Sequence, residues 1–278
     1  MPAPTIHPDP DCPESGLSEG GYVDTHCHLD HHWEATVGDQ VERARAAGVH
    51  RLITIGTDLD SSRQAVEAAS AHEIVWAAVG VHPNDADEAT HDVMDAIEEL
   101  AGHQRTVGVG ETGMDRYRDA TTPEQQEEAF RRHIEIARRA NRTLVIHCRD
   151  AWDPCLAVLE DHGPPDRVVM HCFSGDEHVV RRCADAGWFM SFAGNVTFTN
   201  GEPLRSAAAA VPAELLLTET DSPFLTPHPH RGTPNEPQYV PFVLETLATV
   251  QDRSVDWMRS QVWDNAGRAF RFAEAGTR

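Results

Sequence analysis

Residues 143–147 read Thr-Leu-Val-Ile-His, and residues 167–171 read Arg-Val-Val-Met-His, so one pattern occurs twice: a short apolar run that ends in histidine. Apolar runs without polar alternation are typical of strands covered by protein on both faces, as in parallel sheets. Consecutive parallel strands need a crossover connection, usually a helix. These two segments therefore favour an α/β fold with a parallel sheet.

Similar runs recur along the chain with helical patterns between them. The clearest helix is predicted over residues 122–141, where Thr122 is a suitable N-cap and Pro123 suits the first helical position. Eight strand-helix units over about 250 residues match a closed (β/α)₈ TIM barrel better than an open sheet. The eight predicted strands are Tyr22–His26, Arg51–Gly56, Ile74–Val79, Thr106–Glu111, Thr143–His147, Arg167–His171, Trp188–Phe192 and Leu215–Glu219.

An open dinucleotide-binding sheet is the structural alternative, because Gly108-Val-Gly110-Glu-Thr-Gly113 formally fits a G-x-G-x-x-G fingerprint. The fingerprint belongs after the first strand and opens a helix, whereas here it follows the start of the fourth strand. Glu111 would also place a carboxylate where a pyrophosphate must approach. The barrel is therefore the preferred interpretation.

Length and composition predict one barrel domain, residues 21–278, behind a leader. The chain has 278 residues, and its first 20 hold five prolines without a periodic apolar pattern, which predicts a disordered or loosely draped segment. We expect a cytoplasmic protein, because no signal sequence or membrane span is evident. No obligate protein partner is evident either. The six cysteines are expected to be buried free thiols rather than a disulfide framework.

The net charge is −22, with 45 acidic against 23 basic residues. An average surface of this kind repels polyanions, so any contact with nucleic acid must be local. The alternative is that the acidity serves solubility alone and says nothing about the substrate.

Metal-ligand residue types fall at the predicted strand ends. His26 and His28 are two positions apart, so in an extended chain both imidazoles point to the same side. The carboxyl ends of the strands share one face of a parallel barrel, so ligands far apart in sequence converge there. The predicted ligands are His26, His28, Glu111, His147, His171 and Asp221.

Four histidines and two carboxylates suit Zn²⁺, Mn²⁺, Ni²⁺ or Mg²⁺. A single catalytic zinc takes three protein ligands plus water, so six ligands predict two divalent ions, with a carboxylate such as Glu111 between them. Asp24 and Glu219 lie one strand period before a ligand, which makes them candidates to support ligand imidazoles or waters, or to cap and pack. Arg149 and Arg231 are candidates for phosphate binding, with a structural ion pair as the alternative.

Several motifs together resemble the TatD-family metal-dependent DNases, within the amidohydrolase-like barrels. The resemblance runs from about Gly21 to Phe270. It rests on Asp24-Thr-His26-Cys-His28-Leu-Asp30, Gly80-Val-His82-Pro83, Gly110-Glu111-Thr-Gly113-Met-Asp115, His147-Cys-Arg149-Asp150, His171-Cys-Phe-Ser-Gly175, Glu219-Thr-Asp221-Ser-Pro223 and Arg231-Gly-Thr-Pro-Asn235-Glu236-Pro237.

The resemblance implies hydrolysis of DNA phosphodiester bonds, often from a 3′ end, by water activated between two metal ions. It implies that His26, His28, Glu111 and Asp221 hold one ion and that Glu111, His147 and His171 hold the other. Asp221 is the candidate to manage the proton, with metal ligation alone as the alternative, and His82 is a candidate to bind the scissile phosphate. Thr233 departs from the family, which commonly has a basic residue there, and Met114 stands where Leu is usual.

Two functions therefore remain from the sequence. The first is a deoxyribonuclease acting on DNA ends. The alternative is a hydrolase of a small ester, amide or aminoacyl substrate that uses the same two-metal site. The motifs favour the nuclease, whereas the net charge and Thr233 favour a small or end-bound substrate.

Overall fold

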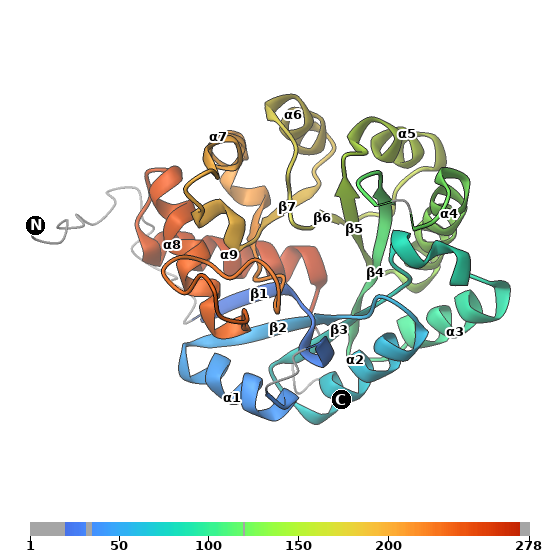
Figure 1. Ribbon diagram of the computed structural model, residues 1–278, viewed down its shortest axis with the longest axis horizontal. Coiled ribbons are helices and arrows are strands. Elements are labelled where there is room, and N and C mark those ends of the chain that lie inside the picture. The colour runs from blue at the N-terminus through green and yellow to red at the C-terminus, as the bar shows by residue number, and fades with distance from the viewer. Residues whose placement is uncertain (1–19, 32–34, 119, 273–278) are drawn as a thin grey trace, which may run out of the picture.

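The computed structural model describes residues 20–31, 35–118 and 120–272, and these form a (β/α)₈ barrel. Figure 1 shows the strands at the centre with the helices around them. The eight strands pair in parallel in chain order, which confirms the predicted fold. They are β1 Tyr22–Cys27, β2 Val49–Ile55, β3 Val75–Val79, β4 Thr106–Asp115, β5 Thr143–Arg149, β6 Val168–Met170, β7 Phe189–Phe192 and β8 Leu216–Thr218.

The helices follow the strands in the expected alternation. They are α1 Val37–Ala46, α2 Leu59–Ala71, α3 His91–Ala101, α4 Pro123–Ala140, α5 Trp152–His162, α6 Glu177–Asp185, α7 Glu202–Ala210, α8 Val240–Val250 and α9 Val255–Phe270. Short 3₁₀ turns lie in the connections: η1 Leu29–His31, η2 Pro83–Glu88, η3 Gly194–Thr197, η4 Ala213–Leu215 and η5 Pro237–Tyr239. None of the helices described is long and apolar enough to span a bilayer.

Helix α4 begins and ends as the sequence predicts. The Thr122 side chain accepts a hydrogen bond from the amide of Gln125, Pro123 occupies the first turn, and Asn141 ends the helix in the left-handed conformation at φ 52°. These caps satisfy polar groups that every helix end leaves free. The buried face of α4 packs Phe130 and Ile134 against the barrel core.

Strand β4 is longer than predicted, and its glycines explain the false dinucleotide fingerprint. The strand continues past Glu111 to Asp115 beside β5. Gly110 and Gly113 have φ values of 138° and 135°, and a Cβ at either would collide with a carbonyl oxygen of β5. These glycines therefore allow two strands to approach closely, and no helix begins after them.

The barrel closes between β8 and β1 through the segments that carry predicted ligands. The amide of Asp221 donates to the carbonyl of His26 at 2.9 Å, and the amide of His28 donates to the carbonyl of Ser222 at 2.8 Å. Among the described residues, the strand pairing at this closure is one isolated parallel bridge, between Cys27 and Ser222. This seam fixes the backbone of three predicted ligands.

The predicted leader, residues 1–20, lies outside the described residues except for Gly20, and the single-domain assignment of residues 21–278 stays a prediction. The five cysteines in the described part of the chain are free thiols, as expected: Cys27, Cys148, Cys155, Cys172 and Cys183.

Candidate metal centre

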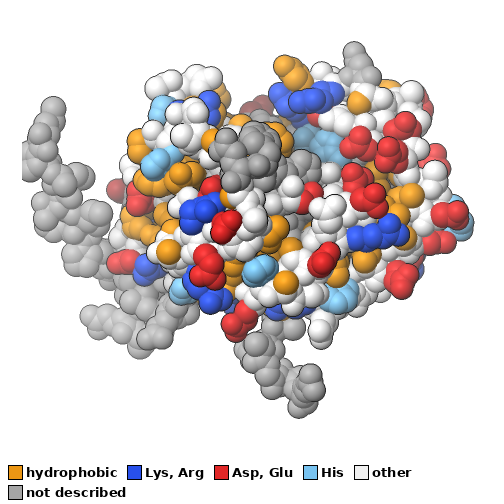
Figure 2. Space-filling model, turned by 60° about the horizontal axis from the view of Figure 1, so that its bottom comes forward, with side chains coloured by type: hydrophobic (Ala, Val, Ile, Leu, Met, Phe, Trp, Pro, Cys, Tyr) orange, Lys and Arg blue, Asp and Glu red, His pale blue; other side chains and the backbone are white. Residues whose placement is uncertain are grey.

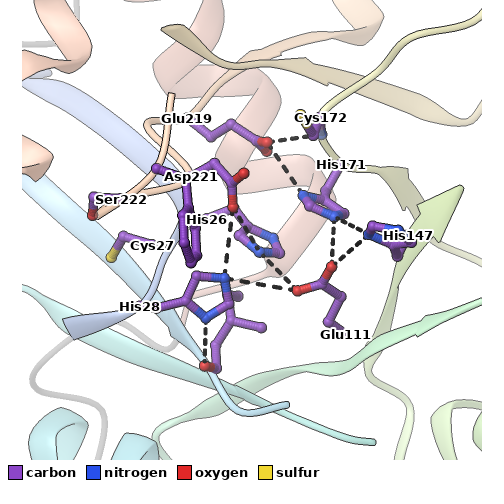
Figure 3. Close-up of polar contacts among 12 residues, drawn as sticks. His26, Cys27, His28, Glu111, His147, His171, Cys172, Glu219, Asp221 and Ser222 are labelled. Carbon is purple, nitrogen blue, oxygen red and sulfur yellow. Dashed lines mark hydrogen bonds and ion pairs between the residues drawn. The ribbon is translucent and has the colours of Figure 1, made fainter. Parts of the chain in front are cut away.

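The six predicted ligands meet at the carboxyl ends of the strands, around the Glu111 carboxylate (Figure 3). Glu111 Oε2 lies 3.2 Å from His26 Nε2 and 3.8 Å from His28 Nε2. Glu111 Oε1 lies 2.8 Å from His147 Nδ1 and 2.8 Å from His171 Nε2. The two oxygens of one buried carboxylate thus lie next to two separate pairs of imidazoles.

Asp221 faces the first of these pairs from the loop after β8. Its Oδ1 lies 3.6 Å from His28 Nε2 and 3.8 Å from His26 Nε2. Its backbone is left-handed at φ 55°, a conformation that Asp tolerates better than most residues. The Asp221 side chain is 15% exposed against 4% for Glu111, so of the two carboxylates it is the more accessible to solvent.

Three of the imidazoles have their far nitrogen held by the protein. His28 Nδ1 lies 3.2 Å from the carbonyl oxygen of Ile55. His147 Nε2 lies 3.3 Å from Asp115 Oδ2, and His171 Nδ1 lies 3.3 Å from Glu219 Oε1. A proton on the far nitrogen leaves the near nitrogen with a free lone pair, which is how proteins orient metal-ligating histidines.

His26 provides the test of whether the site fits a metal. Its ring is fully buried and stacks on His171, with centroids 3.8 Å apart and planes 10° from parallel. Neither ring nitrogen of His26 makes a hydrogen bond, although Nε2 lies close to Glu111. Buried nitrogens are rarely left without a partner, and a divalent cation would supply one here. The donor set of imidazoles and carboxylates agrees with that conclusion.

Charge compensation inside the cluster is strong. Burial favours a raised pKa for Glu111, but His171, His82 and His26 hold its pKa well below the usual range. Burial likewise opposes protonation of His171, yet Glu111 and Glu219 hold the pKa of His171 well above its usual value. Without ions the cluster is therefore a network of shared protons, which divalent ions would displace on binding.

Glu219 and Asp24 support the site in different ways. Glu219 Oε1 contacts His171 and also accepts a hydrogen bond from the amide of Cys172 at 2.7 Å. Asp24 does not reach an imidazole: its carboxylate accepts from the amide of His26 at 3.2 Å and from the amide and hydroxyl of Thr220 at 2.9 and 2.6 Å. Complete burial raises the pKa of Asp24 to about 8, against the lowering effect of the Thr220 hydrogen bonds.

His82 lies beside the second pair, in the connection after β3. Its Nδ1 accepts a hydrogen bond from the amide of Asn84 at 3.0 Å. In a neutral ring the proton is then on Nε2, which lies 3.4 Å from Glu111 Oε1. His82 is therefore arranged as a hydrogen-bond donor toward the site.

The two predicted phosphate-binding arginines are exposed and lie outside the cluster. The Arg149 guanidinium stacks 3.8 Å above the ring of Tyr117. Arg231 donates to the carbonyl of Thr226 at 3.0 Å and lies 3.9 Å above the ring of Phe198. Neither pairs with a carboxylate in the part of the chain that the structure describes.

Asp115 and Asn235 are two residues that the sequence reasoning did not assign. Asp115 holds His147, and the buried Asn235 side chain donates to the carbonyls of Thr220 and Phe224 at 2.8 and 2.5 Å. Both lie inside quoted motifs. Asp115 is four positions after Glu111 and so on the same face of an extended strand, which is a signal that would have found it.

Comparisons with known proteins show which family the chain resembles. The family model described as TatD-related DNase matches residues 23–271. A Mycobacterium tuberculosis protein named uncharacterized metal-dependent hydrolase TatD is 43% identical over 256 residues, which cover 89% of this chain and 97% of that protein. A Klebsiella pneumoniae protein named 3′-5′ ssDNA/RNA exonuclease TatD is 38% identical over 236 residues, which cover 83% of this chain and 90% of that protein.

The fold also matches solved structures. The crystal structure of the TatD homolog YJJV from Escherichia coli superposes with a TM-score of 0.85 at 25% identity, covering 91% of this chain and 98% of that one. The family model covers all six predicted ligands, and these relatives align with more than four fifths of the chain. On these grounds the chain belongs to the TatD family of metal-dependent hydrolases.

Proposed function

We propose that this hydrolase is a nuclease that removes nucleotides from the 3′ ends of DNA strands and uses two divalent metal ions. One observation supports the two-metal part of the proposal: each oxygen of Glu111 lies next to a different pair of metal-ligand candidates, His26 and His28 or His147 and His171. The relatives named 3′-5′ ssDNA/RNA exonucleases support the choice of substrate and polarity.

In this proposal one ion lies among His26, His28, Asp221 and Glu111 Oε2, and the other lies among His147, His171 and Glu111 Oε1. The donor types suit Mg²⁺, Mn²⁺, Zn²⁺ and Ni²⁺. Two ions at such a site, when bound, polarise a non-bridging phosphate oxygen and lower the pKa of water.

The chain's own groups supply proton handling and positioning. Asp221 is ionised at neutral pH, because His28, His26 and His171 lower its pKa against the effect of burial. It is therefore suited to accept the proton of the attacking water. His82, with its proton on Nε2, is suited to donate a hydrogen bond to a phosphate oxygen, and we assign the exposed guanidiniums of Arg149 and Arg231 to flanking phosphates.

The strongly negative charge of the chain favours a second candidate, hydrolysis of a small ester, amide or aminoacyl substrate at the same site. Figure 2 shows acidic side chains spread over one face of the molecule, where a long basic groove for nucleic acid would have to interrupt them. The two candidates predict different products and can be separated directly.

The test uses metal-stripped protein reloaded separately with Mg²⁺, Mn²⁺, Zn²⁺ or Ni²⁺. Each form is offered end-labelled single-stranded DNA, duplex DNA, RNA, a small phosphodiester, and an ester and an amide without phosphate. We expect single nucleotides released from the 3′ end of single strands. Hydrolysis of the ester or amide without any cleavage of nucleic acid would refute the nuclease.

Glu111→Gln is the matched variant for the metal site. It keeps the shape of the side chain but removes the anion between two cations, so we expect fewer than two bound ions per chain and loss of hydrolysis. Two ions per chain with near-normal activity would refute the bridging role. Metal content is measured by elemental analysis of the purified protein, so this result does not depend on the substrate.

A further inference from the structure

Tyr117 and Phe224 are the exposed large hydrophobic side chains in the part of the chain that the structure describes, at 62% and 52% exposure. A single exposed hydrophobic side chain needs no explanation. These two are unusual because both lie at the mouth of the metal centre, although the segments that carry them are more than a hundred positions apart in the chain.

Each of the two residues is connected to a different part of the histidine cluster. The centroid of the Phe224 ring is 6.3 Å from that of His28, on the side of Glu111 Oε2. The backbone amide of Tyr117 is bonded to Asp115, whose carboxylate contacts His147 on the side of Glu111 Oε1. The Phe224 ring and the Tyr117 backbone are therefore attached to different pairs of histidines.

Both rings are held by backbones that are fixed to the cluster. The amide of Tyr117 donates to Asp115 Oδ1 at 2.8 Å, while Oδ2 of the same carboxylate lies 3.3 Å from His147. The amide of Phe224 donates to the carbonyl of Asp221 at 2.9 Å, and the carbonyl of Phe224 accepts from the buried Asn235. The backbones that carry the two exposed aromatic rings are thus held in place, so no loop ordering is needed before a ligand binds against them.

The charges around the rings indicate the kind of ligand. Arg149 lies over the Tyr117 ring at 3.8 Å and brings a guanidinium to the same place as the exposed aromatic surface. Figure 2 shows histidine side chains beside a group of basic and hydrophobic side chains, on a face that is otherwise rich in acidic groups. A ligand that fits has flat apolar rings on both sides of an anion, which is the chemistry of a single nucleic acid strand.

We propose that Phe224 and Tyr117 stack the two bases that flank the scissile phosphate, and that Arg149 neutralises the adjoining phosphate on the Tyr117 side. This inference rests on the proposed nuclease function and extends it to the substrate form. Bases in a duplex are already stacked and paired, so only a single-stranded or frayed end offers their faces to the two rings. Stacking accepts any base, so the site should show little sequence preference.

The test is a cycle that pairs side-chain variants with abasic substrates. Wild type, Phe224→Ala and Tyr117→Ala are assayed for kcat/KM on a single strand that is intact, or that lacks the terminal or the penultimate base. Phe224→Trp and Tyr117→Phe are the matched controls, since they keep an aromatic ring at each position.

On the intact strand each alanine variant should lose about five- to a hundredfold in kcat/KM, the effect of removing one stacking partner. On the strand that lacks the corresponding base, the alanine variant and the wild type should be nearly equal. The aromatic controls should stay within about threefold of wild type on the intact strand, because the stacking surface is kept.

A second readout does not use hydrolysis. A nuclease-resistant phosphorothioate strand carrying 2-aminopurine at the last or the penultimate position should lose fluorescence on binding to wild type and to the aromatic controls. Phe224→Ala should abolish the quenching at one position and Tyr117→Ala at the other.

Equal losses of kcat/KM on intact and abasic strands, or unchanged quenching in both alanine variants, would overturn the stacking role while the nuclease function stood. Wild type that neither cleaves nor binds any strand would overturn the nuclease function and the stacking role together.

Discussion

His133 is a buried residue of α4 through which acid should weaken the fold next to the site. Its Nδ1 lies 2.7 Å from the carbonyl of Ala129, and its Nε2 accepts a hydrogen bond from the amide of Val81 at 3.0 Å, one residue before His82. Both contacts are satisfied only by a neutral ring with its proton on Nδ1. Burial lowers the pKa of His133 from 6.5 to about 4.

The sign and size of the effect follow from proton linkage. The pKa of His133 is lower in the folded state than in the unfolded state, so between these two values the unfolded chain binds one more proton. Stability from the neutral ring is therefore complete above the unfolded pKa and is lost as pH falls toward the folded one. Integrating both titrations between pH 7.5 and pH 5 gives a loss of about 2 kcal/mol in the free energy of unfolding.

The experiment compares wild type with His133→Gln by urea unfolding at pH 7.5 and pH 5, in chelator so that metal release does not contribute. We expect the variant to be less stable at pH 7.5, because glutamine cannot reach both backbone partners. The difference in the free energy of unfolding between the two proteins should narrow by about 2 kcal/mol at pH 5, because only the wild type loses stability through the titration of His133. Other titrating groups are common to both proteins and cancel in the difference.

His91→Gln is the control, since the same substitution there changes a side chain that is 82% exposed. The difference in the free energy of unfolding between this variant and the wild type should be the same at both pH values. If the difference for His133→Gln is also the same at both pH values, the reasoning is refuted. The buried ring would then bind its proton as readily in the folded as in the unfolded state.

Three further predictions concern the site. Asp221→Asn should keep the fold, seen as an unchanged circular dichroism spectrum, but lose more than about a hundredfold in kcat; unchanged turnover would remove Asp221 from proton handling. Glu219→Gln should keep an acceptor for the Cys172 amide but weaken metal binding about ten- to a hundredfold in a chelator competition, because the charge behind His171 is lost. Binding of single-stranded DNA should depend weakly on salt, with a log-log slope of about −1 to −2, and a slope steeper than about −4 would indicate an extended basic groove instead.

The fold was predictable because its signal is repeated and local. Most strands are short apolar runs, and six of the nine helices described begin at a residue whose side chain caps them, as Thr122 does for α4. The convergence of the six predicted ligands was predictable for a related reason. Parallel strands deliver their carboxyl ends to one face, so residue type and position at a strand end were sufficient without any knowledge of side-chain contacts.

What the sequence did not predict depends on backbone conformation. Asp115 was open to prediction from its position four residues after Glu111, but the extension of β4 that brings it to His147 rests on the positive φ of Gly110 and Gly113, which the strand pattern did not indicate. Asp24 was expected to support an imidazole or a water, or else to cap and pack; it accepts hydrogen bonds from the amide of His26 and from Thr220, which only the closure of the barrel brings within reach. Local patterns carry no information on contacts of this kind, between residues nearly two hundred positions apart.

The seam of the barrel, where β1 meets β8, shares residues with the predicted metal centre. β1 and β8 meet through a few backbone hydrogen bonds at His26, His28 and Asp221, whereas β4 and β5 are joined by a long ladder that holds Glu111 beside His147. The residues assigned to the first ion come from both sides: His26, His28 and Asp221 from the seam and Glu111 from the ladder. An ion bound among them would connect the weakest junction of the sheet to one of its strongest. Because an ion that binds only the folded chain stabilises it by mass action, binding and closure would then reinforce each other. The proposed metal site and the closure of the barrel therefore share the same residues.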